Sequence, residues 1–322
     1  MRHLYELQRI RDLANTNDEL VNSRVLGEVE VDGNKFEIIS LVIGPPDETL
    51  PVFGVFGGVH GLERVGTHVV VHWLESLLSR LTWDQHLRES FKHARIVSIP
   101  LINPGGMYLN RRSNPNGIDL MRNAPVEAVS KASFLVGGHR IGAALPWFRG
   151  KVGQDMQLES KTLCDFVLQE TVHAKAIITL DCHSGFGTED RLWYPYAKQV
   201  GEFPHEQSAL AFGDLLRSAH PNHVYIVEPQ AKQYTTNGDL WDFIYDTHLA
   251  RATDVCPPYV PWTLEMGSWA WVRKNPKQAL SLLGPFNPVL SHRYRRTMRR
   301  HLMLFEIMWA AVRNFSSWAR GQ

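Results

Sequence analysis

Two long runs of aliphatic, β-branched residues constrain the fold of this chain more than any other feature of its sequence. They are ARIVSIPLIN (Ala94 to Asn103) and KAIITLDCH (Lys175 to His183), and both end in polar residues. A run that is apolar at almost every position is typical of a strand buried on both faces of a sheet. Because such runs alternate with helical segments, we predict a three-layer α/β/α sandwich around a mixed, mostly parallel central sheet.

Further periodic segments complete this prediction. Val25 to Ile43 contains the turn signal Asp32-Gly33-Asn34, which predicts an antiparallel hairpin. Other strands are predicted at 51–59, 223–229 and 261–267, and helices at 1–22, 67–81, 158–171 and 288–315. Residues 104–153 are rich in Gly, Pro and Asn, and we expect long loops of an active site there. No repeat or linker interrupts the chain, so we expect one catalytic domain over residues 1–322.

The composition argues against several classes of partner. The chain has 34 Lys plus Arg and 33 Asp plus Glu, a net charge of +1 that gives no support to nucleic-acid or acidic-membrane binding. It contains no apolar run long enough to span a membrane, and its first residues lack the apolar core of a signal peptide. Three cysteines without a C-x-x-C pair indicate free thiols, so we expect a cytoplasmic protein. No feature predicts the oligomeric state.

Two segments carry residues of the types that bind zinc. VFGGVHGLE places His60 and Glu63 directly after a predicted strand, in a loop punctuated by glycines. His183 lies at the polar end of KAIITLDCH, where Asp181 either bonds to it or faces the ligand side. Each segment alone is a weak signal, because a surface pair or a buried core histidine would explain it. Together they offer two imidazoles and a carboxylate, which zinc prefers, and leave one coordination position open for catalysis.

Two other segments add charged side chains. The loop 103–123 holds Arg112 and Arg122 between several glycine and proline turns. Arginines on a rigid loop are suited to bind a carboxylate or to stabilise an oxyanion, although a solvated basic loop is the simpler interpretation. Glu265 lies at the end of the apolar strand WTLEMG. A carboxylate at the end of an apolar strand is costly to bury unless it has a function. Activation of a metal-bound water would be such a function.

Taken in order, these motifs resemble those of the zinc metallocarboxypeptidases, the carboxypeptidase A-like (funnelin) family. The matching segments are HGLE at 60–63, NPGG at 103–106, RSNPNGIDLMRN at 112–123, His183, Tyr234 and Glu265. They occur in the family's order and cover residues 51–267. Each motif is weak by itself, but their joint occurrence in order is specific.

The resemblance implies a catalytic centre. His60, Glu63 and His183 would bind one Zn²⁺ per chain. Glu265 matches the residue that acts as general base and then as general acid. Arg112 matches the arginine that polarises the scissile carbonyl and stabilises its oxyanion.

The resemblance also implies the residues around that centre. Asp119 matches the residue that accepts a hydrogen bond from the first zinc histidine, and Arg122 matches the arginine that pairs with the terminal carboxylate of the substrate. Tyr234 is similar to the family's mobile tyrosine. Trp241 and Thr263 correspond to positions that line the pocket for the substrate side chain.

One position departs from the family pattern. The family's D-L-N-R is Asp119-Leu120-Met121-Arg122 here, and Met121 has no donor for the terminal carboxylate. Binding of a free carboxylate would be weakened unless Asn114, which we count among the substrate-binding residues, or Asn123 supplies the donor.

We therefore predict a zinc-dependent, metallocarboxypeptidase-like hydrolase that cleaves a C-terminal peptide bond with a zinc-bound water and Glu265 as general base. The alternative is a zinc amidohydrolase acting on N-acyl amino acids, like aspartoacylases and succinylglutamate desuccinylases. A non-catalytic binding module is less favoured, because all the ligands and Glu265 are present. We interpret the basic run RYRRTMRR (Arg293 to Arg300) as a solvated helix face rather than a nucleic-acid site.

Overall fold

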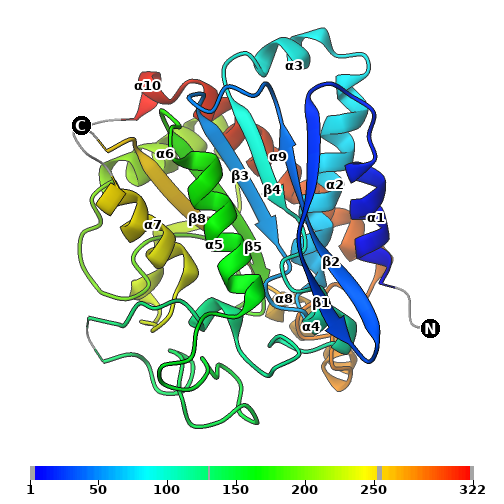
Figure 1. The fold of residues 1–322 in the computed structure, drawn as a ribbon, viewed down its shortest axis with the longest axis vertical. Helices are drawn as coiled ribbons and strands as arrows, with labels where there is room; N and C mark the ends of the chain where they lie inside the picture. The colour runs from blue at the N-terminus through cyan, green and yellow to red at the C-terminus, as the bar shows by residue number, and fades with distance from the viewer. Residues whose placement is uncertain (1–3, 130, 252–255, 320–322) are drawn as a thin grey trace.

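The computed structural model describes residues 4–129, 131–251 and 256–319. Its centre is an eight-stranded sheet with the strand order β1-β2-β4-β3-β5-β8-β6-β7 (Figure 1). The strands are β1 (Val21–Val31), β2 (Asn34–Ile43), β3 (Val52–Gly57), β4 (Arg95–Ile99), β5 (Ile177–Ser184), β6 (Arg191–Tyr194), β7 (Ile226–Pro229) and β8 (Tyr259–Met266). The helices are α1 (Tyr5–Ala14), α2 (Arg64–Leu81), α3 (Gln85–Ser90), α4 (Pro104–Leu109), α5 (Leu158–Thr171), α6 (Glu206–Ala219), α7 (Leu240–Arg251), α8 (Trp269–Lys274), α9 (Ser291–Arg313) and α10 (Phe315–Trp318).

The sheet is mixed and mostly parallel, as predicted. β4, β3, β5 and β8 run parallel to one another, and β6 is parallel to β7. The pairs β1–β2, β2–β4 and β6–β8 are antiparallel. Every residue of β3, β4 and β5 is buried, which explains their near-continuous apolar sequence.

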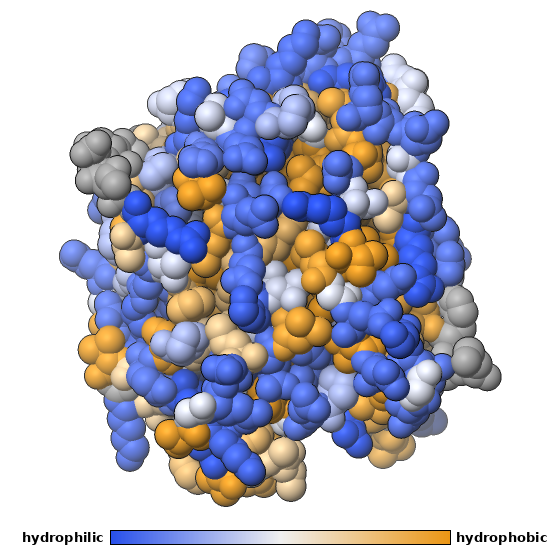
Figure 2. Space-filling view, viewed as in Figure 1, coloured by the Kyte–Doolittle hydropathy of each residue, from blue (hydrophilic) through white to orange (hydrophobic). Residues whose placement is uncertain are grey.

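Helices cover both faces of the sheet and give the three layers that the sequence predicts. α1, α2 and α9 contact one face, while α5 and α7 contact the other, where they lie in front of the sheet in Figure 1. Within the described residues, no helix is both long and apolar enough to cross a membrane. The face shown in Figure 2 is mostly hydrophilic, and its hydrophobic residues lie in separate patches.

The predicted elements agree with the structure in most places. The hairpin at Asp32-Gly33 is confirmed, and α5 has the predicted bounds. The N-terminal helix, predicted over 1–22, ends at Ala14, and its first three residues lie outside the described ones. The predicted helix is therefore wrong over residues 15–22. The segment Asn15-Thr16-Asn17-Asp18 favours bonds from its side chains to the nearby backbone over a helix, and β1 begins at Val21.

The strand order positions the candidate site. The parallel strands β3, β5 and β8 end at the same edge of the sheet, and loops between α4 and α5 gather at that end (Figure 1). Residues that follow these strands therefore come together although they lie far apart in the sequence. The predicted single catalytic domain over residues 1–322 stays a prediction.

Candidate metal centre and active site

The loop between β3 and α2 carries the first two predicted zinc ligands. His60 lies three residues after the end of β3, and Glu63 directly precedes α2. Gly61 allows this loop to pack on α4, because a Cβ on Gly61 would lie only 2.1 Å from the carbonyl carbon of Gly106. The glycine is therefore required for the close approach that turns both ligand side chains inward.

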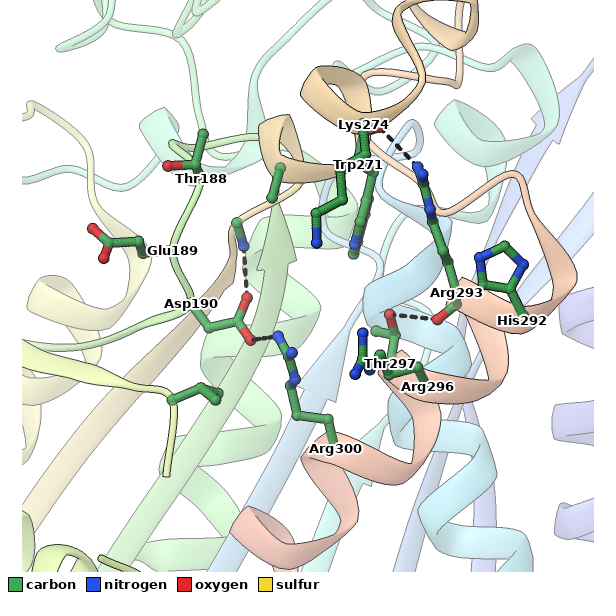
Figure 3. Close-up of a pocket in the computed structure, with 13 residues that line it drawn as sticks. Thr188, Glu189, Asp190, Trp271, Lys274, His292, Arg293, Arg296, Thr297 and Arg300 are labelled. Atoms are coloured by element: carbon green, nitrogen blue, oxygen red, sulfur yellow. Dashed lines mark hydrogen bonds and ion pairs between the residues drawn. The ribbon is translucent and has the colours of Figure 1, made fainter. Parts of the chain in front are cut away.

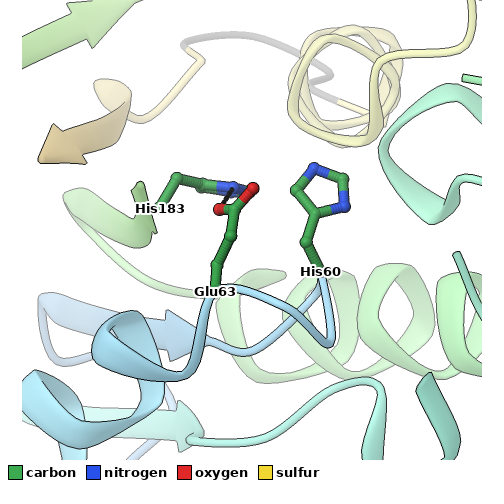
Figure 4. A group of neighbouring side chains, drawn as sticks. All are labelled: His60, Glu63 and His183. Carbon is green, nitrogen blue, oxygen red and sulfur yellow. Dashed lines mark hydrogen bonds and ion pairs between the residues drawn. The ribbon is translucent and has the colours of Figure 1, made fainter. Parts of the chain in front are cut away.

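His60, Glu63 and His183 converge on one point, and Figure 4 shows the three side chains facing one another. One donor atom from each lies within 4.8 Å of the others, and all three residues are buried. Nδ1 of His60 is buried and has no hydrogen-bond partner among the described residues. Burial, and then the Arg112 cation, hold the pKa of His60 well below its usual range, which favours the neutral imidazole that a metal binds. This donor set fits Zn²⁺.

His183 is held by a carboxylate on its far side. Its Nε2 lies 2.7 Å from Oδ2 of Asp181, while its Nδ1 lies 3.2 Å from Oε2 of Glu63. Because Asp181 occupies Nε2, Nδ1 is the nitrogen left to bind a metal. The backbone N–H of Ser184 donates to the same oxygen of Glu63 at 2.9 Å and fixes that carboxylate.

Arg112 connects the ligands to Asp119. Its Nε donates to Oδ2 of Asp119 at 2.8 Å, and its Nη1 donates to Oε1 of Glu63 at 3.1 Å. Nη2 lies 2.7 Å from Nε2 of His60. Asp119 also lies beside His60, with 3.8 Å between its Oδ1 and Nδ1 of the imidazole. The guanidinium thus lies at the edge of the donor set.

Glu265 lies beside His183 because of the strand register. β8 runs parallel to β5 and pairs Glu265 with His183, so both side chains emerge at the same end of the sheet. Oε2 of Glu265 is buried and has no hydrogen-bond partner among the described residues. Burial, and then the nearby Glu63 carboxylate, raise the pKa of Glu265 to about 8. Oε2 is therefore free to bind a water or a substrate, and the positive charge of a bound metal would lower the pKa of Glu265 again.

Arg122 and Tyr234 lie together on another side of the site. The Arg122 guanidinium carbon is 5.9 Å from the centre of the Tyr234 ring. Arg122 is held by two backbone carbonyls, since its Nε donates to Val136 and its Nη1 donates to Met121. Burial raises the pKa of the Tyr234 phenol, and Arg122 opposes that effect. A carboxylate placed between Arg122 and Tyr234 would meet a cation and a hydroxyl donor.

Thr263 lies on the same face of β8 as Glu265, two residues earlier. Its neighbour in the register is Trp193 of β6, whose ring contacts both Tyr234 and Phe186 edge-on. Thr263 is only partly buried, so this aromatic group and Thr263 form a wall beside Glu265.

Two residues predicted to bind the substrate, Trp241 and Asn114, form hydrogen bonds with other buried side chains instead. Trp241 is buried, and its indole N–H donates to Oδ2 of Asp181 at 2.9 Å, so it supports the partner of His183. Asn114 is buried, and its amide donates to Gln157 and Glu159. Both placements favour a structural role over contact with a substrate side chain.

The structure also explains the departure at Met121. Its side chain is buried in the hydrophobic core, 4% exposed. Neither neighbouring asparagine replaces the absent donor: Asn114 donates to Gln157, and Asn123 donates to the carbonyl of Arg149. Among the residues predicted to bind a terminal carboxylate, Arg122 and Tyr234 are therefore the ones left to donate to it.

A cavity of about 490 Å³ opens beside Arg112 and Asp119. Its apolar wall is formed by Leu62, Leu109, Leu145, Trp147 and Leu282. This volume is within the range of small-molecule sites and lies next to the metal ligands.

Sequence reasoning left the role of Asp181 open and missed its link to Trp241. The spacing of Asp181 and His183 was the available signal, because residues two apart on a strand share a face. The Trp241 contact spans 60 positions and had no local signal.

The fold and the His-Glu-His donor set are those expected of the zinc carboxypeptidases. The family model of zinc carboxypeptidases matches residues 8–268. The chain therefore belongs to the zinc carboxypeptidase family.

Two known carboxypeptidases are similar in sequence to parts of this chain. Carboxypeptidase SOL1 of Arabidopsis thaliana is 24% identical over 202 residues, which are 62% of this chain and 36% of that protein. Carboxypeptidase M of Mus musculus is 32% identical over 85 residues, which are 24% of this chain and 19% of that protein. The chain thus spans little more than a third of the length of the first relative and less than a fifth of the second.

Solved structures support the fold. Thrombin-activatable fibrinolysis inhibitor superimposes with a TM-score of 0.69 at 17% identity, covering 95% of this chain and 72% of the other. Carboxypeptidase A from Helicoverpa armigera gives a TM-score of 0.61 at 19% identity, covering 82% and 64%.

Proposed function

We propose that this protein is a metallocarboxypeptidase that holds one Zn²⁺ through His60, Glu63 and His183 and removes the C-terminal residue of a peptide. The observation that carries the proposal is the pairing of His183 with Glu265 across two parallel strands. It sets a proton acceptor beside the three buried donor atoms. A buried donor set with an adjacent free carboxylate is the arrangement that hydrolysis of an amide requires.

Each residue then has a role in the proposed reaction. Zinc, when bound, would lower the pKa of water and polarise the scissile carbonyl. Glu265 takes a proton from the attacking water and passes one to the leaving amine. Arg112 donates to the oxyanion, and Arg122 with Tyr234 holds the terminal carboxylate of the substrate. The cavity beside Arg112 gives room for the peptide on the other side of the scissile bond.

A second candidate is the hydrolysis of N-acyl amino acids. The zinc ligands and Glu265 would keep the same roles, because both reactions hydrolyse an amide whose leaving amine is an amino acid. Only the acyl group would differ. The buried Met121 does not separate the two candidates, since an N-acyl amino acid also carries a free carboxylate.

Two substrate panels separate the candidates. The zinc-loaded protein is incubated with peptides that have free C-termini and with N-acyl amino acids, and the products are identified by mass spectrometry. We expect loss of single C-terminal residues from the peptides, and no loss from the same peptides with amidated C-termini. Cleavage of N-acyl amino acids alone would establish the second candidate, and no turnover of either panel would reject both.

A further inference from the structure

The basic run on α9 divides into two faces. Arg293, Arg296 and Arg300 follow the spacing i, i+3 and i+7, which places them on one side of the helix. All three line a cavity, whereas Arg295 and Arg299 do not. Arg295, Arg296, Arg299 and Arg300 are all exposed to solvent, so part of the solvated face expected from the sequence also borders the cavity.

The cavity lies between α8, α9 and the segment before β6, and its volume is about 380 Å³ (Figure 3). Lys274 and Trp271 form the α8 wall, and Arg296 and Arg300 come from the α9 wall. Asp190 is buried at its floor. This cavity is separate from the zinc ligands, none of which lines it.

The charges that line this cavity do not cancel. Arg300 is paired with Asp190 at 2.9 Å, and Glu189 lies 3.8 Å from Arg191. Within the described parts of the chain, no carboxylate is within ion-pair distance of Lys274 or Arg296. Arg293 is likewise unpaired there, and its Nη1 donates to the carbonyl of Trp271. The lining therefore has four cations, Lys274 and three arginines, against two carboxylates, and carries an excess of positive charge.

The walls of the cavity are fixed by hydrogen bonds. The Arg293 bond to Trp271 ties α9 to α8 at 2.9 Å. Asp190 accepts from Arg300 on one oxygen and from the backbone N–H of Gly267, at 2.9 Å, on the other. The elements that carry the cations are thus already joined, so a ligand would have to order only the side chains of Lys274 and Arg296.

We propose that this cavity binds a small, multiply charged anion of the phosphate class. Guanidinium groups and an ammonium are the side chains that bind phosphate oxygens through charge-assisted hydrogen bonds. The Trp271 ring adds an apolar surface for the rest of a small phosphorylated molecule. The proposal does not depend on the peptidase activity.

The shape of the site favours a small molecule over a nucleic acid. A volume of about 380 Å³ fits a compact ligand, and the charge is concentrated in a hollow rather than along an extended groove. The net charge of the whole chain is only +1, which offers little attraction for a long polyanion.

Phosphorus NMR tests the proposal on the full chain. Inorganic phosphate is titrated at constant ionic strength, so that general screening stays unchanged. The parent is compared with Arg296→Gln and Lys274→Gln, and with Arg295→Gln and Arg299→Gln as matched controls on the same helix. We expect saturable binding that is weakened about tenfold by each cavity variant and changed less than twofold by each control.

Three results would overturn the proposal. The absence of saturable phosphate binding to the parent would reject the site. Equal weakening in the cavity variants and the controls would show a diffuse basic face. Binding of a single-stranded oligonucleotide, lost in all four variants while phosphate does not bind, would assign α9 to nucleic acid instead.

Discussion

Oδ2 of Asp181 lies 2.7 Å from Nε2 of His183, and both residues are buried on the same strand. The same oxygen accepts the indole N–H of Trp241 from α7. Burial opposes the protonated form of His183, but Asp181 and Glu63 outweigh it and raise the pKa of the imidazole. The carboxylate thus fixes which nitrogen of His183 faces the other two donors.

Replacing Asp181 is expected to weaken zinc binding. Asp181→Asn keeps the size of the side chain but removes the charge that orients His183, and loss of such a partner lowers metal affinity about 10- to 100-fold. Zinc affinity is measured by competition with a chelator. Asp165→Asn, which removes the same charge from the exposed face of α5, serves as the control and should leave the affinity unchanged. Equal zinc affinities for Asp181→Asn and the parent would show that Asp181 does not support metal binding by His183.

Glu265→Gln is expected to separate metal binding from chemistry. The amide keeps the shape and cannot accept the proton, so turnover should fall at least about a hundredfold while zinc content stays at the parental level. Steady-state kinetics on a peptide that the parent cleaves, together with metal analysis, measures both. Near-parental turnover in this variant would show that another group is the base.

Met121→Asn is expected to destabilise the fold rather than to restore the missing donor. Its side chain is buried among apolar residues, so a buried amide without partners should lower the free energy of unfolding by about 1–3 kcal/mol. Met121→Leu conserves volume and should cost less than about 1.5 kcal/mol. Denaturant unfolding of both variants measures this. A lower KM for peptides in Met121→Asn, at unchanged stability, would instead mean that the asparagine reaches the substrate.

Glu6 on α1 is expected to make stability depend on pH. Its Oε1 accepts from Arg64, the residue after Glu63, and lies 3.0 Å from His68. Burial opposes ionisation of Glu6, but His68 and Arg64 outweigh it and lower its pKa from 4.5 to about 2. The stabilisation is therefore complete above about pH 4.5 and is lost as the pH falls through about 2.

Unfolding of Glu6→Gln at several pH values checks this dependence. At pH 7 the variant should be less stable than the parent by on the order of 2–3 kcal/mol, and this difference should shrink below about pH 4.5. Glu30→Gln, on β1, provides a control without such ion pairs among the described residues. A difference that stays constant down to pH 2.5 would contradict the ionic origin of the stabilisation.

The sequence predicted the central layers well because their signals are local. Continuous apolar runs identified β4 and β5, and the Asp32-Gly33 turn identified the first hairpin. β6 was missed because its four residues, RLWY, include no β-branched residue. α6 was missed as well, and Gly213 in its interior lowers its helix propensity.

The candidate site shows the same division. His60, Glu63, His183 and Glu265 could be predicted, because each follows or ends a strand at the sheet edge where such sites form. The bond from Trp241 to Asp181 could not, since it depends on how α7 packs against β5. The same holds for Asn114, whose partners Gln157 and Glu159 lie more than 40 positions away.

The zinc content of the parent and of His183→Ala tests the central claim most directly. The three donors lie within 4.8 Å of one another, so removing one of them should open the site. Metal analysis after removal of loosely bound ions should find close to one zinc per chain in the parent and sharply less in the variant. Full zinc occupancy in His183→Ala, or no zinc in the parent after loading, would contradict the account.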